Sequence, residues 1–562
     1  MYRTIPGIVI SCSTLYFAVA LFAATPPRVV GPVESHGRLL ILPSGLWQAY
    51  AVRDAAGTFQ LVREGSGDEG RSWSDAQVLT ALPGAGWGGV LPLLDSHGEL
   101  QIILTRRRGE GKEIAVNRFI DLWHIRSIGK QTYWSSPQRV FEGYVGSIQE
   151  ILQLSNGRIV LPFAAWIAGR PSGPPTGPNE TTVAYSDDDG ATWKQSPSHL
   201  TAPCVAGYNG SNYGAIEPAI LQLQDGRVWM LMRTQTGFLY ESFSRDGIEW
   251  SAARSSRFVS STSPAFLLRL RDHRIVLFWN NAVMPPRVDE QGVYGGRDVL
   301  HAAISSDDGA TWRGYREVYR DPYRNDPPPK TGDRGTAYPY AAETADGRIA
   351  LVSGQGAGRR ALILIDPSWL LETRAETHFE DGLAQWCVFQ GVGPASGWWR
   401  NRIAGAQLVP DPGNGGRRVL RVSRTSAQPG GGAVWNFPMG WSGELSIDLR
   451  LERGFGGAAL SLDESFFDPA DDAGLGDAVF RLPIPDSGVL GAAHLESGKW
   501  HKVTLRWDAK RHTCAVLVDG ASVVTLSAGK AAAVSYLRVR STAPHPDPAG
   551  MLVAGATVAV KP

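Results

Sequence analysis

Net charge is almost absent from this chain of 562 residues. Its 55 Lys and Arg residues nearly balance its 54 Asp and Glu residues, which leaves a formal net charge of +1, and neither sign forms a long run. Proteins that bind nucleic acid or an anionic membrane surface usually carry a concentrated basic patch. The composition therefore gives no reason to expect a nucleic-acid partner or a membrane-surface partner.

Cysteine is also scarce, with four residues in the whole chain. Cys12 lies in the N-terminal segment, Cys387 and Cys514 could form a disulfide in an oxidising compartment, and Cys204 would then be left over. These separations do not match the ligand spacing of a metal site. The sequence also has no phosphate-binding loop, so we expect neither a metal nor an organic cofactor.

Only one stretch is apolar enough to span a membrane, and it lies at the N-terminus. Arg3 precedes the apolar residues 5–24, small residues gather near the end of this stretch, and Pro26 and Pro27 end any helix. This order is typical of a secretory signal peptide, which we place at residues 1–24. We therefore expect a secreted or periplasmic protein without stable membrane insertion after cleavage. Retention as a membrane anchor is the alternative, because the stretch is close to spanning length.

Glycine and proline are abundant, with 65 and 37 residues, which favours many short strands joined by turns. The length favours two or three domains. A motif of the form S-x-D-x-G-x-(S/T)-W recurs every 58 to 61 residues, with copies at 66–73, 127–134 (decayed), 186–193, 244–250 (shortened) and 305–312. Its Ser and Asp side chains can bond the backbone of a tight turn, so we expect these Asp residues to be structural and not catalytic.

Six pairs of apolar runs interleave with this motif, and each pair flanks a short turn. The turns lie at Ser44-Gly45, His97-Gly98, Asn156-Gly157, Asp225-Gly226, Asp272-His273 and Asp346-Gly347. Two strand-like runs around such a turn predict a β-hairpin. Six hairpins with five motifs between them predict six four-stranded blades, which close into a propeller over residues 28–372.

The repeated motif is the Asp-box, or BNR repeat, of the sialidase (neuraminidase) superfamily. The region 28–372 resembles that superfamily both in the spacing of the boxes and in the interleaved hairpins. The resemblance implies a sialidase-type six-bladed propeller.

The C-terminal part has a different pattern, which predicts a β-sandwich over residues 376–562 and makes the chain all-β. Residues 500–508 read W-H-x-V-x-L-x-W-D, and residues 516–520 read V-x-V-D-G. The alternation predicts an antiparallel hairpin. The order resembles the concanavalin/laminin-G jelly-roll family, whose domains either bind glycans or pack against a catalytic partner. Both alternatives remain open from the sequence.

Chemistry in a propeller is expected on the inner strand of each blade, beside the central channel. Glu217 and Tyr338 each lie eight residues before the Asp of their hairpin turn, which predicts equal depth in two blades. The resemblance implies that Tyr338 is the nucleophile and that Glu217 activates it. It also implies that Arg233 and Arg297 bind the carboxylate of an acidic sugar by charge-assisted hydrogen bonds.

The sequence departs from the superfamily at its first blade. The first of three carboxylate-binding arginines is expected near residue 35, which is Ser, and Arg38 is expected to point to the other face of its strand. The loop that carries the acid/base Asp is short and offers only Asp54. We predict Asp54 or His36 as the acid/base residue, with Glu34 as a further substitute. Glu34 and Asn280 also join the predicted substrate-binding residues.

These residues favour a secreted exo-glycosidase of the sialidase type, which hydrolyses a terminal acidic sugar with retention and needs a glycan as its partner. Two other functions stay open. A polysaccharide lyase would use Tyr338 or His36 as a base without a Glu–Tyr couple. A non-catalytic glycan-binding protein would explain the missing arginine and the missing acid.

Overall fold

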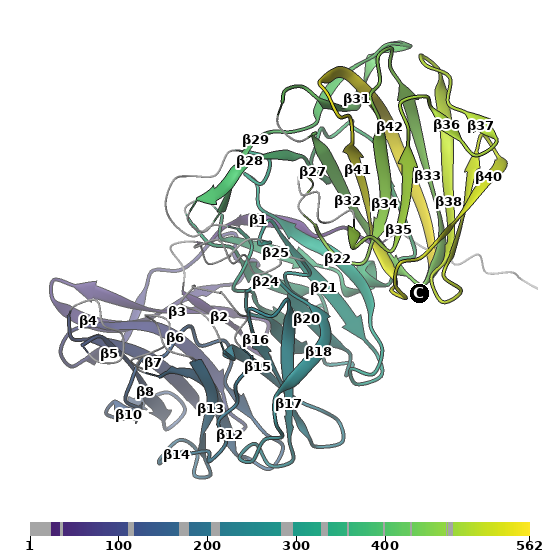
Figure 1. The fold of residues 1–562 in the computed structure, drawn as a ribbon. Helices are drawn as coiled ribbons and strands as arrows, with labels where there is room; N and C mark the ends of the chain where they lie inside the picture. Colours follow the sequence, from purple (N-terminus) through teal and green to yellow (C-terminus); the bar gives the residue numbers. More distant parts are fainter. Residues whose placement is uncertain are drawn as a thin grey trace, which may run out of the picture.

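The computed structural model describes residues 24–562 apart from 34–36, 111–116, 168–178, 204–213, 283–295, 327–334, 357–358, 397–398, 428–429, 468 and 470–475. The described part is built from β-strands, with one short 3-10 helix, η1 (Pro367–Leu371). Figure 1 shows two bodies of sheets, a propeller coloured purple to teal and a sandwich coloured green to yellow. This confirms the predicted all-β fold class with a propeller followed by a β-sandwich.

The first three blades follow one another in the sequence. The first contains β2 (Arg38–Ile41), β3 (Trp47–Ala55), β4 (Thr58–Ser66) and β5 (Gln77–Leu82). The second contains β6 (Trp87–Leu94), β7 (Leu100–Arg108), β8 (Phe119–Ile128) and β10 (Gln138–Phe141), with β9 (Tyr133–Trp134) beside β8. The third contains β11 (Leu152–Gln153), β12 (Ile159–Trp166), β13 (Asn179–Ser186) and β14 (Lys194–Gln195).

The last three blades continue the pattern. The fourth contains β15 (Ile216–Gln222), β16 (Val228–Arg233), β17 (Phe238–Ser244) and β18 (Arg254–Val259). The fifth contains β19 (Phe266–Arg269), β20 (Ile275–Trp279), β21 (Val299–Ser305) and β22 (Arg313–Arg320). The sixth contains β23 (Tyr340–Glu343), β24 (Ile349–Ser353), β25 (Ala361–Ile365) and β1 (Arg28–Pro32). The sixth blade therefore takes its outer strand from the start of the propeller.

All six predicted turns join the first two strands of a blade, and all six have the same backbone pattern. In each, the amide of the first turn residue bonds the carbonyl four residues on, and the amide three residues on bonds back. Residues at equal distances before these turns therefore lie at equal depth in the six blades. Four residues before the turn, the inner strands carry Arg38, Leu91, Glu150, Ala219, Phe266 and Tyr340.

The Asp-box turns join the outer two strands of their blades. In the box at 186–193, the Asp188 carboxylate accepts from the amide of Thr192 at 2.8 Å, from its hydroxyl at 2.6 Å and from Ser186 Oγ at 2.8 Å. Ser186 Oγ in turn accepts from the amide of Gly190. These bonds hold the Asp-box carboxylate within its own turn, which confirms the predicted structural role.

The decayed box of the second blade has lost its Asp, and Glu99 from the neighbouring hairpin turn takes its place. Ser127 Oγ donates to Glu99 Oε2 at 2.5 Å, and Glu99 Oε1 accepts from the amide of Lys130 at 2.6 Å. These bonds lower the pKa of Glu99. The turn is thus stabilised by a carboxylate that is distant in the sequence.

The second body is a sandwich of two antiparallel sheets. The larger has the order β30 (Gln407–Asp411), β31 (Asn414–Arg424), β42 (Asp547–Lys561), β33 (Ser442–Leu451), β38 (Trp500–Asp508), β39 (Thr513–Val518) and β40 (Ala521–Ser527), with β26 (Arg374–Thr377) on β42. The smaller has the order β27 (Trp386–Cys387), β32 (Gly432–Gly440), β41 (Val534–Ser541), β34 (Ala458–Asp463) and β35 (Phe480–Ile484). Two hairpins are added, β28 (Phe389–Ser396) with β29 (Trp399–Ala404), and β36 (Val489–Leu490) with β37 (Ala493–His494).

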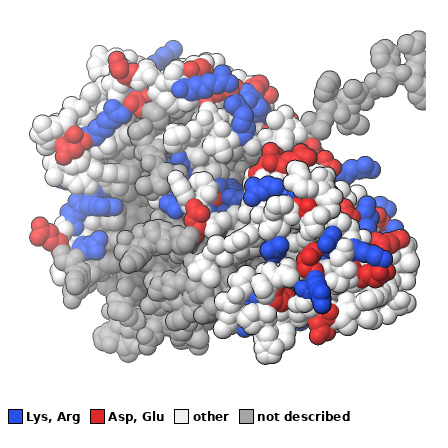
Figure 2. Space-filling view, turned by 90° about the horizontal axis from the view of Figure 1, so that it is seen from above, with Lys and Arg blue, Asp and Glu red and all other residues white. Residues whose placement is uncertain are grey.

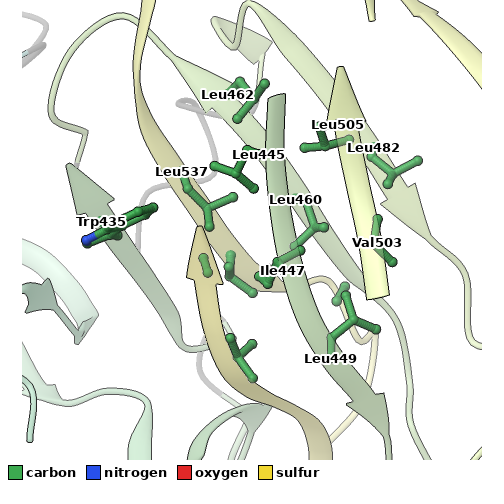
Figure 3. Packing of buried hydrophobic residues seen from close by; sticks show 14 of the residues in the cluster. Trp435, Leu445, Ile447, Leu449, Leu460, Leu462, Leu482, Val503, Leu505 and Leu537 are labelled. Carbon is green, nitrogen blue, oxygen red and sulfur yellow. The ribbon is translucent and has the colours of Figure 1, made fainter. Parts of the chain in front are cut away.

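The inner faces of the two sheets form the core of the sandwich. Figure 3 shows leucine, isoleucine and valine side chains from both sheets filling the space between them. On β33, Leu445, Ile447 and Leu449 are buried while the residues between them are not, as strand alternation requires. Residues 500–508 form β38, which pairs with β39 as the predicted hairpin.

Cys387 and Cys514 do not form the disulfide that the sequence allowed. Cys514 is buried in the sandwich core, and burial raises the pKa of its thiol to about 12. Cys387 belongs to a separate buried cluster, which joins the sandwich to the propeller. Cys514 therefore lies between the two sheets, whereas Cys387 lies at the contact with the propeller. Cys204 lies outside the described residues.

The propeller and the sandwich are in contact through β22 and β32, which lie next to each other in Figure 1. A buried apolar cluster at this contact contains Ala282, Val299, Cys387, Phe389, Val434, Phe466 and Tyr536. In the described part of the chain, no helix has the length and apolar character that a membrane crossing requires.

Candidate active site

The site forms around Glu217 and Tyr338, which occupy equivalent positions in the fourth and sixth blades. Both residues have positive φ angles, 48° and 61°, which non-glycine residues rarely adopt. Glu217 lies in a β-bulge, because β15 has one extra residue between Ile216 and Ala219. A bulge redirects the side chain of the extra residue and is frequent next to active sites.

The sixth blade repeats this local geometry. Tyr340 pairs with Val352, and the next backbone bond runs from the Gly354 amide to the Ala337 carbonyl, so one extra residue stands on the inner strand here too. Tyr338 lies in the irregular segment between Ala337 and Tyr340 that contains this extra residue. The same backbone irregularity in two blades therefore presents one carboxylate and one phenol to each other.

The two side chains are hydrogen-bonded. Tyr338 Oη donates to Glu217 Oε1 at 3.0 Å. Burial is the main reason that the pKa of Tyr338 is raised, and the negative charge of Glu217 raises it further. Tyr338 is therefore a protonated phenol at neutral pH, and it needs a base before its oxygen can attack as a nucleophile. Glu217 is in position to be that base.

Arg233 completes a triangle with this pair. It is 1% exposed, and its Nη1 donates to Glu217 Oε2 at 2.7 Å and to Tyr338 Oη at 3.2 Å. Arg233 ends β16 and stands opposite Ile216 at the bulge. Its guanidinium forms an ion pair with the Glu217 carboxylate, and its positive charge would stabilise a phenolate on Tyr338.

Arg297 approaches the same tyrosine from the fifth blade. It is fully buried, and its guanidinium carbon lies 5.6 Å from the centre of the Tyr338 ring. Its Nη1 donates to Gln355 Oε1 and its Nη2 to the Thr262 carbonyl, both at 2.7 Å. The Thr262 hydroxyl accepts from Arg233 Nε at 3.1 Å. Thr262 thus accepts a hydrogen bond from each of the two guanidiniums.

Asn280, which is predicted to bind substrate, hydrogen-bonds to protein groups in the structure. It is fully buried, and its Nδ2 donates to the Val299 carbonyl at 2.7 Å and to Thr336 Oγ1 at 3.1 Å. Its Oδ1 accepts from Ser263 Oγ at 2.7 Å. All of its hydrogen-bonding groups therefore hold protein segments next to Arg297 and Thr262.

Of the predicted acid/base residues, the structure describes only Asp54. Asp54 is exposed near the end of β3, where its Oδ1 accepts from the Gly57 amide at 2.7 Å in the hairpin turn. Among the described residues, no hydrogen bond or ion pair joins Asp54 to the Tyr–Glu pair. Glu34 and His36 lie outside the described residues.

Arg38 points into the ring of inner strands and not to the opposite face, so that expectation was wrong. Its guanidinium stacks 4.1 Å from the centre of the Tyr340 ring, lies 5.9 Å from that of Phe266, and donates to the Gln149 carbonyl. The turn pattern explains this orientation, because Arg38 stands four residues before its turn, as Tyr340 and Phe266 do.

Glu150 faces Arg38 in this ring, and no sequence signal identified it. Its Oε2 accepts from the Ile220 amide at 2.8 Å. Burial raises its pKa to about 8, and the charge of Arg38 opposes this rise only in part. Burial likewise lowers the pKa of Arg38 to about 10. Arg38, which is charged, and Glu150, which is largely protonated at neutral pH, therefore lie on the inner strands two residues nearer to the hairpin turns than Glu217 and Tyr338 do.

Comparison with known families places the chain. A model of the BNR repeat-like domain matches residues 45–351, more than half of the chain. The chain belongs to the BNR repeat-like family. No curated protein matches this BNR repeat-like protein.

Figure 2 shows acidic and basic side chains interspersed over the described surface of one face, without a broad patch of one sign.

Several solved structures are similar to this BNR repeat-like protein. Trypanosoma rangeli sialidase in complex with sialic acid matches with 15% identity and a TM-score of 0.41, over 93% of this chain and 91% of that one. A protein of unknown function from Dyadobacter fermentans matches with 16% identity and a TM-score of 0.43, over 61% and 99%. The NanB sialidase from Streptococcus pneumoniae matches with 12% identity and a TM-score of 0.41, over 61% and 71%.

Proposed function

We propose that this BNR repeat-like protein is a glycoside hydrolase that removes a terminal acidic sugar, sialic acid or a related sugar, from a glycan. Tyr338 is the nucleophile and Glu217 is its base. The observation that carries the proposal is the 3.0 Å hydrogen bond from Tyr338 Oη to Glu217 Oε1 beside two buried guanidiniums. Export of the protein belongs to the same proposal and rests on residues 1–24.

The chemistry of an acidic sugar explains why a phenol is used. The transition state of glycoside cleavage resembles an oxocarbenium ion, and most enzymes attack it with a carboxylate. A sugar that carries its own carboxylate would repel that nucleophile, whereas a neutral phenol approaches without repulsion. Arg233 and Arg297 supply positive charge for the sugar carboxylate.

The proposed reaction consists of two displacements at the anomeric carbon. A bond forms between Tyr338 Oη and the anomeric carbon, and the phenolic proton moves to Glu217 Oε1. The glycosidic bond breaks, and its oxygen leaves with a proton from a general acid. Water then displaces Tyr338 from the anomeric carbon and gives one proton to the conjugate base of the general acid, while Glu217 returns the proton to the phenol. Two displacements at one carbon retain its configuration. Asp54, His36 and Glu34 stay predictions for the general acid.

A second function, glycan binding without catalysis, is favoured by one observation. Asp54 is exposed and accepts a hydrogen bond within its own turn, and no hydrogen bond among the described residues joins it to the Tyr–Glu pair. A site without a general acid would bind an acidic sugar through its arginines and leave the glycosidic bond intact.

One set of assays separates these functions. Purified protein is incubated with a fluorogenic sialoside, and the Tyr338→Phe variant is compared with Tyr50→Phe, a buried tyrosine in the first blade. Release of the fluorophore by the wild type and by Tyr50→Phe, with a loss of at least about a thousandfold in Tyr338→Phe, supports the hydrolase. Retention on immobilised sialoglycan without release supports glycan binding. Ultraviolet absorbance from uronate polymers would instead indicate a lyase.

A further inference from the structure

The sandwich reaches the candidate site through a chain of buried hydrogen bonds that starts at Tyr536 on β41. His301 on β21 is fully buried, and its Nε2 lies 2.5 Å from Tyr536 Oη. Its Nδ1 accepts from the Asn281 amide at 3.1 Å. Because Nδ1 is an acceptor, the ring proton is on Nε2 and is donated to Tyr536, which donates its own proton to Glu317 Oε1 at 2.6 Å.

Burial keeps His301 and Tyr536 each in one protonation state at physiological pH. It lowers the pKa of His301 to about 3 and raises the pKa of Tyr536 well above its ordinary value. His301 is therefore a neutral ring in a single tautomer, and each of its nitrogens has one role. The direction of every bond from Asn281 to Glu317 is fixed.

Two further contacts from the sandwich hold the same short segment. The Asn281 carbonyl accepts from the Phe466 amide at 2.9 Å, and Asn281 Nδ2 donates to the Glu464 carbonyl at 3.2 Å. Asn281 is 2% exposed. Its amide, carbonyl and side chain are thus all fixed by His301 and by the segment that follows β34.

The neighbouring Asn280 transmits this constraint to the site. Asn280 Nδ2 bonds Thr336 Oγ1, and Thr336 bonds the Arg297 carbonyl through its amide at 2.7 Å and its hydroxyl at 3.0 Å. Thr336 precedes Tyr338 by two residues. Asn280 Oδ1 also fixes Ser263, the neighbour of Thr262. One asparagine therefore ties together the backbones that present Arg297, Tyr338 and Thr262.

We propose that the sandwich is a positioning element of the candidate active site. Tyr536, acting through His301 and the pair Asn281–Asn280, fixes the backbone at Arg297 and Thr336 and so sets the distance between the second guanidinium and the tyrosine. The proposal rests on the proposed function for its catalytic consequence, but the backbone coupling itself can be measured without any substrate.

Hydrogen–deuterium exchange tests the coupling directly. The full chain with Tyr536→Phe loses the phenol that holds His301, and the matched control Tyr50→Phe loses an equally buried phenol outside this network. We expect the Asn281 and Thr336 amides to exchange about tenfold faster in Tyr536→Phe only, because His301 loses its partner there. A tenfold change corresponds to a fall of about 1.4 kcal/mol in the free energy of local opening. Unchanged exchange at both amides, or faster exchange confined to the sandwich, would overturn the proposal.

Kinetics test the consequence. Tyr536→Phe is expected to raise KM for an acidic glycoside about tenfold and to change kcat less than about twofold, because the arginine grip is loosened while the Tyr–Glu pair remains. Adding Tyr536→Phe to Arg297→Lys should have little further effect, since both changes act on one contact. Fully additive effects in this double-mutant cycle contradict the positioning role.

Two precautions keep the outcomes separate. Tyr536→Phe could lower the stability of the whole chain, and in that case the milder variant Asn281→Ala is used, which removes only the bond to the Glu464 carbonyl. Asn281→Ala is also expected to accelerate amide exchange at Thr336. Unchanged exchange at Thr336 in this variant counts against the proposal. If the wild type has no turnover, the proposed hydrolase fails, and the exchange rates alone decide whether the sandwich positions the site.

Discussion

Glu150 offers a quantitative test of the inner ring of the propeller. Its pKa of about 8 in the folded protein is well above the ordinary value for glutamate, about 4.3. The folded state therefore binds a proton that the unfolded state has released at neutral pH. Stability is full below about pH 4 and falls as the pH rises through the window from about 4.3 to about 8.

The magnitude follows from these two values. At pH 7 the linkage amounts to about 4 kcal/mol, and it approaches about 5 kcal/mol above pH 9. Glu150→Gln retains an oxygen that can accept from the Ile220 amide but cannot ionise. The variant should match the wild type near pH 4 and should be more stable than it by about 4 kcal/mol at pH 7.

The assay is urea unfolding followed by tryptophan fluorescence at several pH values, with the difference between variant and wild type as the readout. All other titrating groups cancel in that difference. Glu249→Gln, at an exposed position in the fourth blade, is the control for the same Glu-to-Gln change outside the inner ring. If the advantage of Glu150→Gln is constant from pH 5 to 9, or if the variant is the less stable protein at pH 8, Glu150 is ionised beside Arg38 and the reasoning is refuted.

Three further predictions concern a buried ion pair, an Asp-box and the two described thiols. Glu217→Gln leaves the buried Arg233 without its counterion, so the free energy of unfolding should fall by about 3–5 kcal/mol, measured by urea unfolding; a change below about 1 kcal/mol would contradict the ion pair. Asp188→Ala removes an acceptor of three hydrogen bonds and should lower stability by about 1–3 kcal/mol without changing sugar binding, as titration calorimetry can check. Dithiothreitol should leave the Tm unchanged, because Cys387 and Cys514 are not bonded; a lower Tm in reductant would indicate a disulfide.

Local patterns made most of the propeller predictable from the sequence. Each hairpin turn and each Asp-box is a contact among residues a few positions apart, so its residue types appear together in the sequence. Glu217 and Tyr338 were found because their distance from these turns is the same. The bulge that directs them could not be foreseen, since it depends on the pairing of β15 with β16.

The remaining parts of the site come from contacts between blades, for which a single sequence holds no pattern. Thr262 joins the two guanidiniums from a segment that has no motif. Arg38 and Glu150 face each other only because the ring closes. Glu99 replaces a lost Asp from 28 positions away. His36 and Glu34 lie outside the described residues, so their predicted roles stay predictions.

The strand β1 has a consequence for biosynthesis and for mechanical strength. It pairs with β25, so Pro32 meets Ala361 across nearly the whole length of the propeller sequence. During translation the final blade cannot be completed until β25 has emerged, and until then the edge of β1 stays open to wrong pairing. A pulling force on the amino terminus would act first on the hydrogen bonds between β1 and β25. A short peptide with the sequence of residues 28–32 could occupy the vacant edge in a chain that lacks them.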